Sequence, residues 1–197
     1  MIVGVVAVQG AVSEHVSSLK RAMSGMGISG EVILVRGGDD VRKADALVIP
    51  GGESTTISKL LVRFGIRDAI LERAARDDLP IMGTCAGMVL LSKDAGVQAK
   101  RTGTVLLELM DLAVDRNAFG RQRESFETEL AVKGFDSPVH AVFIRAPAGT
   151  VARGDCEALA TFDGKIVLAR QGRRMAVAFH PELTDDTRIH EMFLKMV

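Results

Sequence analysis

A chain of 197 residues, 47% of them hydrophobic, is long enough for one domain with a substantial core. Its 25 basic and 25 acidic side chains balance, so no net charge attracts nucleic acid or an anionic membrane. The absence of tryptophan and tyrosine also argues against base stacking, and two cysteines are too few for a disulfide-rich secreted protein. We therefore expect a single domain over residues 1–197, in the reducing cytoplasm, with no nucleic-acid or membrane partner.

The first half of the chain alternates strand-like and helix-like segments. Residues 2–8 form a short apolar run typical of a buried strand, and they lack the basic flank of a signal peptide. Residues 12–26 have apolar positions at helical spacing, and Gly27 ends this pattern. Further strands are predicted over 31–36, 46–49 and 79–82, and further helices over 55–64 and 66–76. This rhythm predicts a three-layer α/β fold with a mostly parallel sheet between helices.

The second half is predicted to be rich in strands. The strand-like segments cover residues 109–115, 126–132, 139–145, 157–162, 165–170 and 175–179. Asp163 and Gly164 lie between two of them and indicate a hairpin, so antiparallel strands are expected here. Residues 184–197 are predicted to form a closing helix with Thr184 or Asp185 as its N-cap. Residues 94–103 match no pattern, and we expect a surface loop.

A glycine-rich loop follows the predicted strand at 46–49. From Pro50 to Ser54 it reads Pro-Gly-Gly-Glu-Ser. Adjacent glycines let the backbone approach a ligand closely and point N–H groups into a site. The loop is therefore a candidate donor to an oxyanion hole. An ordinary turn with Ser54 as the N-cap of the next helix is the alternative.

A second motif, Gly83 to Gly87, reads Gly-Thr-Cys-Ala-Gly between a predicted strand and an apolar helical run at 88–91. This is the nucleophile-elbow pattern with cysteine at its apex. The following helix favours a thiolate at Cys85, and the N–H of Ala86 can donate to an oxyanion. Taken alone, the pattern also fits a cysteine that is merely a small buried hydrophobic residue.

A third motif, His180-Pro181-Glu182, ends the strand-like run at 175–179. Sites in α/β folds form where parallel strands end. In extended backbone His180 and Glu182 point to the same side, so the carboxylate can reach one imidazole nitrogen while the other faces Cys85. The motif thus supplies a base and a group that orients it for a cysteine nucleophile. A capped strand end with a solvated glutamate is the alternative.

Together these motifs resemble those of the class I triad glutamine amidotransferases. Within that class the chain resembles the family of glutaminase subunits of pyridoxal 5′-phosphate synthase. The segments that carry this resemblance are 8–12, 50–56, 116–122, 125–127, 143–147 and 179–184. They extend over nearly the whole chain, and residues 94–103 are the one stretch without a recognised counterpart.

The resemblance implies hydrolysis of L-glutamine to L-glutamate and ammonia, without a cofactor or a metal. Cys85 would form a γ-glutamyl thioester, His180 would take the thiol proton, and Glu182 would orient His180. Gly52 and Ala86 would form the oxyanion hole. The residues implied to bind glutamine are Gly52, Glu53, Ser54, Arg116, Ile144 and Arg145.

Arg116 and Arg145 have a physical rationale as well. The α-carboxylate of glutamine needs a cation, and a guanidinium offers a bidentate fork. From the residues alone, a surface ion pair is the alternative for either arginine.

The resemblance also implies a protein partner. Gln9 and Gly10 follow the first predicted strand at the same sheet edge as Cys85, and in the family this region faces the synthase subunit. Ammonia would pass to that synthase within a large hetero-oligomer, because this chain offers no phosphate-sugar site or Schiff-base lysine of its own. His15 has no assigned role, and Cys156 is interpreted as a small buried residue.

Three other functions are weighed against this one. A glutaminase of another pathway, such as imidazole glycerol phosphate synthesis, is disfavoured by the segments at 116–122 and 143–147. A non-catalytic regulatory subunit is disfavoured by the intact set of cysteine, histidine and glutamate. A cysteine peptidase or stress-response protein of related fold is disfavoured by the His-Pro-Glu ending and by the two arginines.

Overall fold

The computed structural model describes residues 1–119 and 125–197. The elements in chain order are β1 (Ile2–Val6), α1 (Val12–Gly25), β2 (Glu31–Val35), α2 (Gly38–Lys43), β3 (Ala46–Ile49), α3 (Ser54–Arg63), α4 (Ile66–Asp77), β4 (Ile81–Thr84), α5 (Ala86–Leu91), β5 (Ser92–Asp94), α6 (Gly96–Thr102), β6 (Met110–Asp115), β7 (Ser125–Leu130), β8 (Val139–Ile144), β9 (Ala148–Ala152), β10 (Glu157–Phe162), β11 (Lys165–Gln171), β12 (Arg174–Val177), the 3₁₀ turn η1 (Pro181–Leu183) and α7 (Arg188–Leu194).

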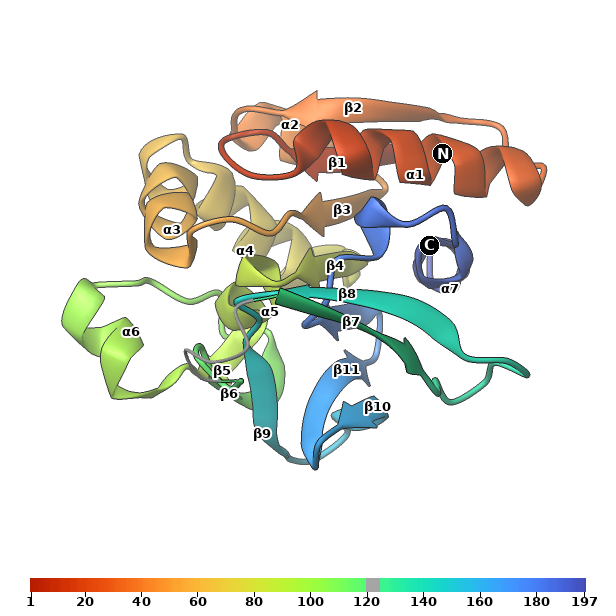
Figure 1. Ribbon diagram of the computed structural model, residues 1–197. Coiled ribbons are helices and arrows are strands. Elements are labelled where there is room, and N and C mark those ends of the chain that lie inside the picture. The colour runs from red at the N-terminus through yellow and green to blue at the C-terminus, as the bar shows by residue number, and fades with distance from the viewer. Residues whose placement is uncertain (120–124) are drawn as a thin grey trace.

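A mixed sheet forms the centre of the molecule, with the order β2-β1-β3-β4-β12-β11-β9-β6-β5 and with β10 paired to β11. The strands from β2 to β12 in this order are all parallel. The side chains of β1, β3, β4 and β12 are almost entirely buried, which explains the continuous apolar runs there, whereas the edge strand β2 is partly exposed. Helices lie on both faces, with α1 against α7, and with α4 against α2 and α3 (Figure 1). The predicted α/β fold is confirmed.

The other half of the sheet is largely antiparallel. Strand β11 pairs antiparallel with β12, β10 and β9, and β9 pairs antiparallel with β6. Strands β7 and β8 form a separate hairpin that crosses in front of this sheet (Figure 1). A cluster of phenylalanines holds the hairpin down, and Phe126 stacks on Phe143 with 4.6 Å between ring centroids. Phe143 also packs on Phe179, so the end of β8 is fixed beside the chain that leads to His180.

Two segments differ from their predictions. Residues 94–103 are not a loop, because they contain the end of β5 and helix α6. The Asp94 carboxylate accepts the N–H of Gly96 just before this helix, and Gly103 ends it with a left-handed φ of 64°. The pattern was missed because only Ala99 within the helix is buried. Strand β9 and the short helix α2 were missed as well.

The closing helix was predicted to begin too early. It begins at Arg188, and neither Thr184 nor Asp185 is its N-cap. The 3₁₀ turn η1 occupies residues 181–183 instead, and the Asp186 carboxylate accepts the N–H of Arg188. Pro181, which fixes φ and starts the 3₁₀ turn, explains why the helix is delayed.

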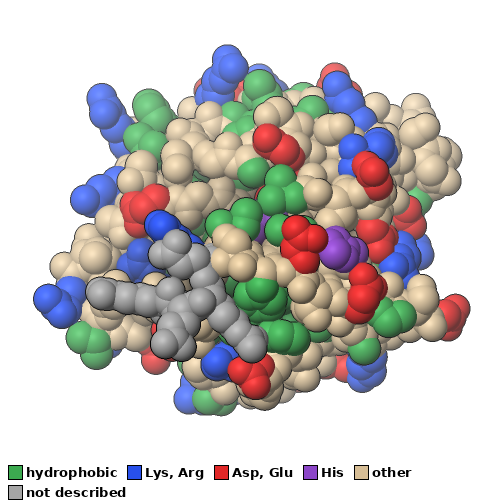
Figure 2. Space-filling view, in the orientation of Figure 1, with side chains coloured by type: hydrophobic (Ala, Val, Ile, Leu, Met, Phe, Trp, Pro, Cys, Tyr) green, Lys and Arg blue, Asp and Glu red, His purple; other side chains and the backbone are tan. Residues whose placement is uncertain are grey.

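The surface carries no dominant charge on the side seen in Figure 2, where acidic and basic side chains are interspersed. Among the described helices, none has both the length and the apolar character that a membrane crossing requires.

Candidate active site

Cys85 lies at a sharp turn between β4 and α5. Its backbone has φ 47° and ψ −101°, a conformation that is costly for a residue with a side chain. A Cβ on Gly83 would lie 2.5 Å from the backbone of Gly87, and a Cβ on Gly87 would collide with the carbonyl oxygen of Ile49. The two glycines therefore permit the turn, as the elbow motif predicts.

His180 and Glu182 form a buried hydrogen bond, with 2.7 Å between His180 Nδ1 and Glu182 Oε1. The two residues are 8% and 5% exposed. The predicted pairing is present, but the predicted reason is wrong, because Glu182 lies in the 3₁₀ turn η1 rather than in extended backbone. The backbone N–H of His180 donates to the carbonyl of Val142 in β8, which fixes the start of this turn.

The environment of His180 favours its charged form. Burial opposes protonation, but hydrogen bonds with Cys85 and with Glu182 outweigh it and raise the pKa of His180 to about 10. An imidazolium beside Cys85 near neutral pH stabilises a thiolate there. The arrangement can therefore present a charged sulfur nucleophile together with a proton donor.

Gly51 allows this contact and was not among the predicted site residues. A Cβ at Gly51 would lie 2.6 Å from Cε1 of His180 and 3.1 Å from Cβ of Cys85. Glycine is therefore the residue that lets the loop pack directly on both side chains. The sequence signal was the pair of glycines, but only the fold shows which of the two touches His180.

Glu53, not Ser54, is the N-cap of α3, so the alternative assignment of Ser54 is wrong. The Glu53 carboxylate accepts the backbone N–H groups of Thr55 and Thr56. Partial burial opposes the charged form, but the hydrogen bonds from Thr56 and Thr55 lower the pKa of Glu53 to about 2. Glu53 thus brings a permanent negative charge to the rim of the site.

The segment predicted to face a partner contacts the same loop. The side-chain oxygen Oε1 of Gln9 accepts the N–H of Glu53 at 3.0 Å. Gly52 has φ 157°, and a Cβ there would lie 2.6 Å from Gln9 Oε1. A Cβ at Gly10 would collide with the carbonyl oxygen of Gly51. Residues 9 and 10 are therefore packed against the loop that carries the proposed oxyanion donor.

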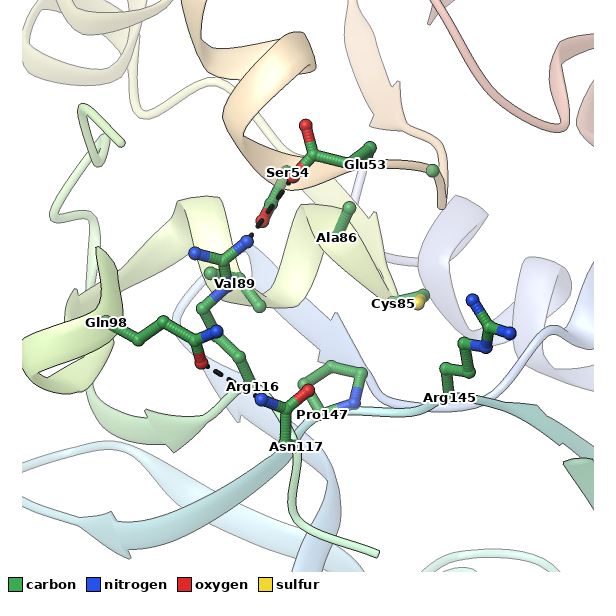
Figure 3. A pocket seen from close by; sticks show the side chains of 11 residues that line it. Glu53, Ser54, Cys85, Ala86, Val89, Gln98, Arg116, Asn117, Arg145 and Pro147 are labelled. Atoms are coloured by element: carbon green, nitrogen blue, oxygen red, sulfur yellow. Dashed lines mark hydrogen bonds and ion pairs between the residues drawn. The ribbon is translucent and has the colours of Figure 1, made fainter. Parts of the chain in front are cut away.

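A cavity of about 150 Å³ opens beside Cys85 (Figure 3). The predicted residues that line it are Gly52, Glu53, Ser54, Cys85, Ala86, Arg116 and Arg145. Ile144, at the end of β8, precedes Arg145 and is 40% exposed, but it does not line the cavity. The structure therefore brings most of the predicted binding residues together.

The two predicted arginines approach the cavity from different sides, as Figure 3 shows. Arg116 Nη2 lies 3.4 Å from Glu53 Oε1, and Arg116 Nη1 lies 3.3 Å from the hydroxyl of Thr102. Arg145 has a left-handed φ of 45°, which is a strained backbone beside the site. Both guanidinium groups can meet an anionic group of a ligand.

Four lining residues were not predicted: Val89, Gln98, Asn117 and Pro147. The side-chain amide of Asn117 donates to Oε1 of Gln98 at 2.9 Å and closes one wall of the cavity. Gln98 was not predicted, because the sequence pattern over residues 94–103 indicates a loop and not the helix α6. Asn117 lies in the recognised segment 116–122, of which residues 120–122 fall outside the described residues.

Comparisons with known proteins show the family of the chain. Residues 5–197 match the SNO glutamine amidotransferase family. The chain is 56% identical to pyridoxal 5′-phosphate synthase subunit PdxT of Archaeoglobus fulgidus and 50% identical to that of Methanosarcina mazei, over 100% of this chain and 98% of each relative.

Solved structures show the same likeness. A crystal structure of a glutamine amidotransferase, 42% identical, has a TM-score of 0.88 and covers 100% of this chain and 98% of its own. A glutamine amidotransferase from Thermotoga maritima, 13% identical, has a TM-score of 0.61, covers 98% of this chain and 82% of its own, and shares the fold. The chain belongs to the SNO glutamine amidotransferase family.

Proposed function

We propose that this chain is a glutaminase that hydrolyses L-glutamine and delivers the ammonia to a pyridoxal 5′-phosphate synthase subunit. The observation that supports this most strongly is an elbow cysteine at a cavity, beside the buried pair of His180 and Glu182. The names of the relatives favour this pathway over other glutaminase pathways. Conversely, a purely regulatory role leaves the strained elbow without an explanation.

The first half of the reaction uses Cys85 as the nucleophile and His180 as the proton donor. The thiolate attacks the carboxamide carbon of glutamine, and the π electrons of the carbonyl move to its oxygen. The N–H groups of Ala86 and Gly52 stabilise this oxyanion. The carbon–nitrogen bond then breaks, the proton of His180 goes to the leaving nitrogen, and ammonia departs from a γ-glutamyl thioester.

The second half releases glutamate. Neutral His180 removes a proton from water, the hydroxide adds to the thioester carbon, and the carbon–sulfur bond breaks. The sulfur leaves as a thiolate beside the regenerated imidazolium. Glu182 keeps Nδ1 of His180 occupied, so that Nε2 faces the reacting atoms.

Substrate recognition falls to the residues around the cavity. Arg116 and Arg145 bind the α-carboxylate, because a guanidinium pairs with a carboxylate through two hydrogen bonds. The α-ammonium group of glutamine is positive, and the negative charge of Glu53 suits it. Ser54 and Ile144 complete the set inferred from the family, Ser54 in the cavity wall and Ile144 next to Arg145.

A partner subunit would act through Gln9 and Gly10. These residues hold the loop that supplies the N–H of Gly52, so docking against them can change the oxyanion site. We further infer that residues 1–197 act as one domain. The two unpaired cysteines suit a reducing compartment such as the cytoplasm.

The test is ammonia release from glutamine, measured for the chain alone and with the candidate synthase subunit. We expect slow turnover alone and marked stimulation by the synthase. Equal turnover with and without the synthase would disprove the partner dependence. No turnover in either sample, from folded protein, would disprove the glutaminase itself.

A further inference from the structure

Two histidines behind the proposed catalytic residues take no part in the reaction described above. His15 lies in α1 and His190 in α7, and neither is exposed to solvent. Burial lowers the pKa of His15 well below its usual value, and the neighbouring His190 and His180 lower it further. Burial, with a contribution from Arg21, lowers the pKa of His190 to about 4. Both rings are therefore neutral at physiological pH.

The two rings connect Glu182 to the helices that cover it. His15 Nε2 lies 3.4 Å from Glu182 Oε2 and 2.9 Å from the hydroxyl oxygen of Thr84. His15 Nδ1 lies 3.2 Å from His190 Nε2. Glu182 Oε2 is buried and accepts no hydrogen bond within the described structure, so the ring of His15 is a polar group poised to satisfy it.

The contact with Glu182 and the buried Nδ1 of His190 favour one assignment of the ring hydrogens. With its hydrogen on Nε2, His15 directs an N–H toward the oxygens of Thr84 and Glu182, and its Nδ1 accepts from Nε2–H of His190. His190 Nδ1 then carries a lone pair, and this atom is one of those buried without a partner. The opposite assignment would turn a lone pair toward an anionic oxygen and bury an unsatisfied N–H on His190.

We propose that His15 is a positioning residue that holds the second carboxylate oxygen of Glu182 and so fixes the orientation of His180. This inference rests on the proposed roles of Glu182 and His180. With Oε1 bound to His180 and Oε2 facing His15, the carboxylate cannot rotate freely about its last bond.

The position of His15 in α1 gives this contact a further consequence. Helix α1 begins at Val12, directly after the segment of Gln9 and Gly10 that holds the oxyanion loop. It also packs against η1, which carries Glu182. A displacement of the start of α1 would therefore move both the loop around Gly52 and, through Glu182, the base His180.

Two substitutions separate this role from simple packing. In His15→Gln an amide N–H takes the place of Nε2, whereas in His15→Asn the polar group reaches only as far as Nδ1. Measured with the synthase subunit present, His15→Asn should lower kcat about 10- to 100-fold. KM for glutamine should not change, because the cavity is intact. His15→Gln should retain kcat within about fivefold, since one hydrogen bond is largely preserved.

Ser18→Ala is the matched control, because Ser18 is almost as deeply buried in α1, and its hydroxyl oxygen accepts a hydrogen bond from Arg21 instead of bonding to Glu182. It should leave kcat unchanged, and thermal unfolding should show that all variants are folded. Equal losses in His15→Gln and His15→Asn, or a full kcat in His15→Asn, would overturn the proposal. Turnover that survives Cys85→Ala would instead overturn the proposed function.

A measurement on the unaltered chain covers the case in which a variant does not fold. Nitrogen-15 NMR of the imidazole rings distinguishes the two tautomers directly. We expect hydrogen on Nε2 in both His15 and His190. Hydrogen on Nδ1 of His15 would overturn the proposal without any substitution.

Discussion

The two cysteines of the chain lie in two turns that differ in backbone conformation and in the groups around the sulfur. Cys85, between β4 and α5, and Cys156, between β9 and β10, are similarly buried, at 9% and 7% exposed. Cys85 has a strained backbone and a hydrogen-bonded imidazole beside it. Cys156 has an ordinary turn, in which its N–H donates to Arg153. Burial and the carboxylate of Asp111 raise the pKa of its thiol.

The difference shows that burial does not decide whether a cysteine is a nucleophile. Burial disfavours a thiolate, so a buried thiolate needs a positively charged group next to it. His180 supplies that cation at Cys85. At Cys156 the charge that acts on the thiol is the negative charge of Asp111, which disfavours a thiolate. The backbone conformation then determines whether the sulfur meets a cavity.

The largest effect is expected from replacing each cysteine in turn. Cys85→Ala should lower kcat by about 10³-fold or more, because the nucleophile is lost. Cys156→Ala should keep kcat within about twofold and alter only stability, as a small core substitution does. Ammonia release and thermal unfolding measure both. Comparable loss of activity in the two variants would remove the distinction between the two turns.

A smaller but still large effect is expected when the partner of His180 is changed. Glu182→Gln keeps the shape and removes the charge, so kcat should fall by about 10²-fold or more. The pKa of His180, about 10 in the unaltered chain, should fall, because Glu182 is one of the groups that raise it. Proton NMR of the ring during a pH titration measures this. An unchanged pKa would mean that the carboxylate does not stabilise the imidazolium.

The close packing at Gly51 gives a third comparison. In Gly51→Ala the new methyl group would press on His180 and Cys85, and kcat should fall by about 10²-fold through misplacement of the base. Gly25→Ala is the control, because no atom lies within 4 Å of a Cβ there. Its kcat should not change. Normal turnover in Gly51→Ala would show that the positions of His180 and Cys85 do not depend on close packing of the loop at Gly51.

The sequence predicted the parallel half of the fold well because each buried strand there is a short apolar run. The strand Ala46–Ile49 was predicted to the residue, and β4 was predicted two residues early. Helix α6 and strand β9 were missed, since a helix with one buried residue and a short irregular strand leave weak patterns. The predicted start of α7 was wrong, because residues with capping side chains at 184 and 185 do not reveal that a 3₁₀ turn at 181–183 delays the helix.

The residues of the candidate site also fall into those that the sequence predicted and those that it did not. Local motifs predicted Cys85, His180 and Glu182 as a set, and the structure brings these three together. Gly51, Gln98 and His15 were not assigned roles, because their importance comes from contacts with residues distant in the sequence. Ile144 was predicted from the resemblance, and it stays a prediction because it does not line the cavity.

The central claim is that Cys85 is the nucleophile that attacks glutamine. An electrophilic glutamine analogue, such as a diazoketone, traps such a nucleophile covalently, and mass spectrometry of peptides locates the adduct. We predict one adduct per chain, on Cys85, with free glutamine slowing its formation and with Cys156 unmodified. Modification of Cys156 instead, or no adduct on Cys85 in folded protein that releases ammonia, would contradict the account.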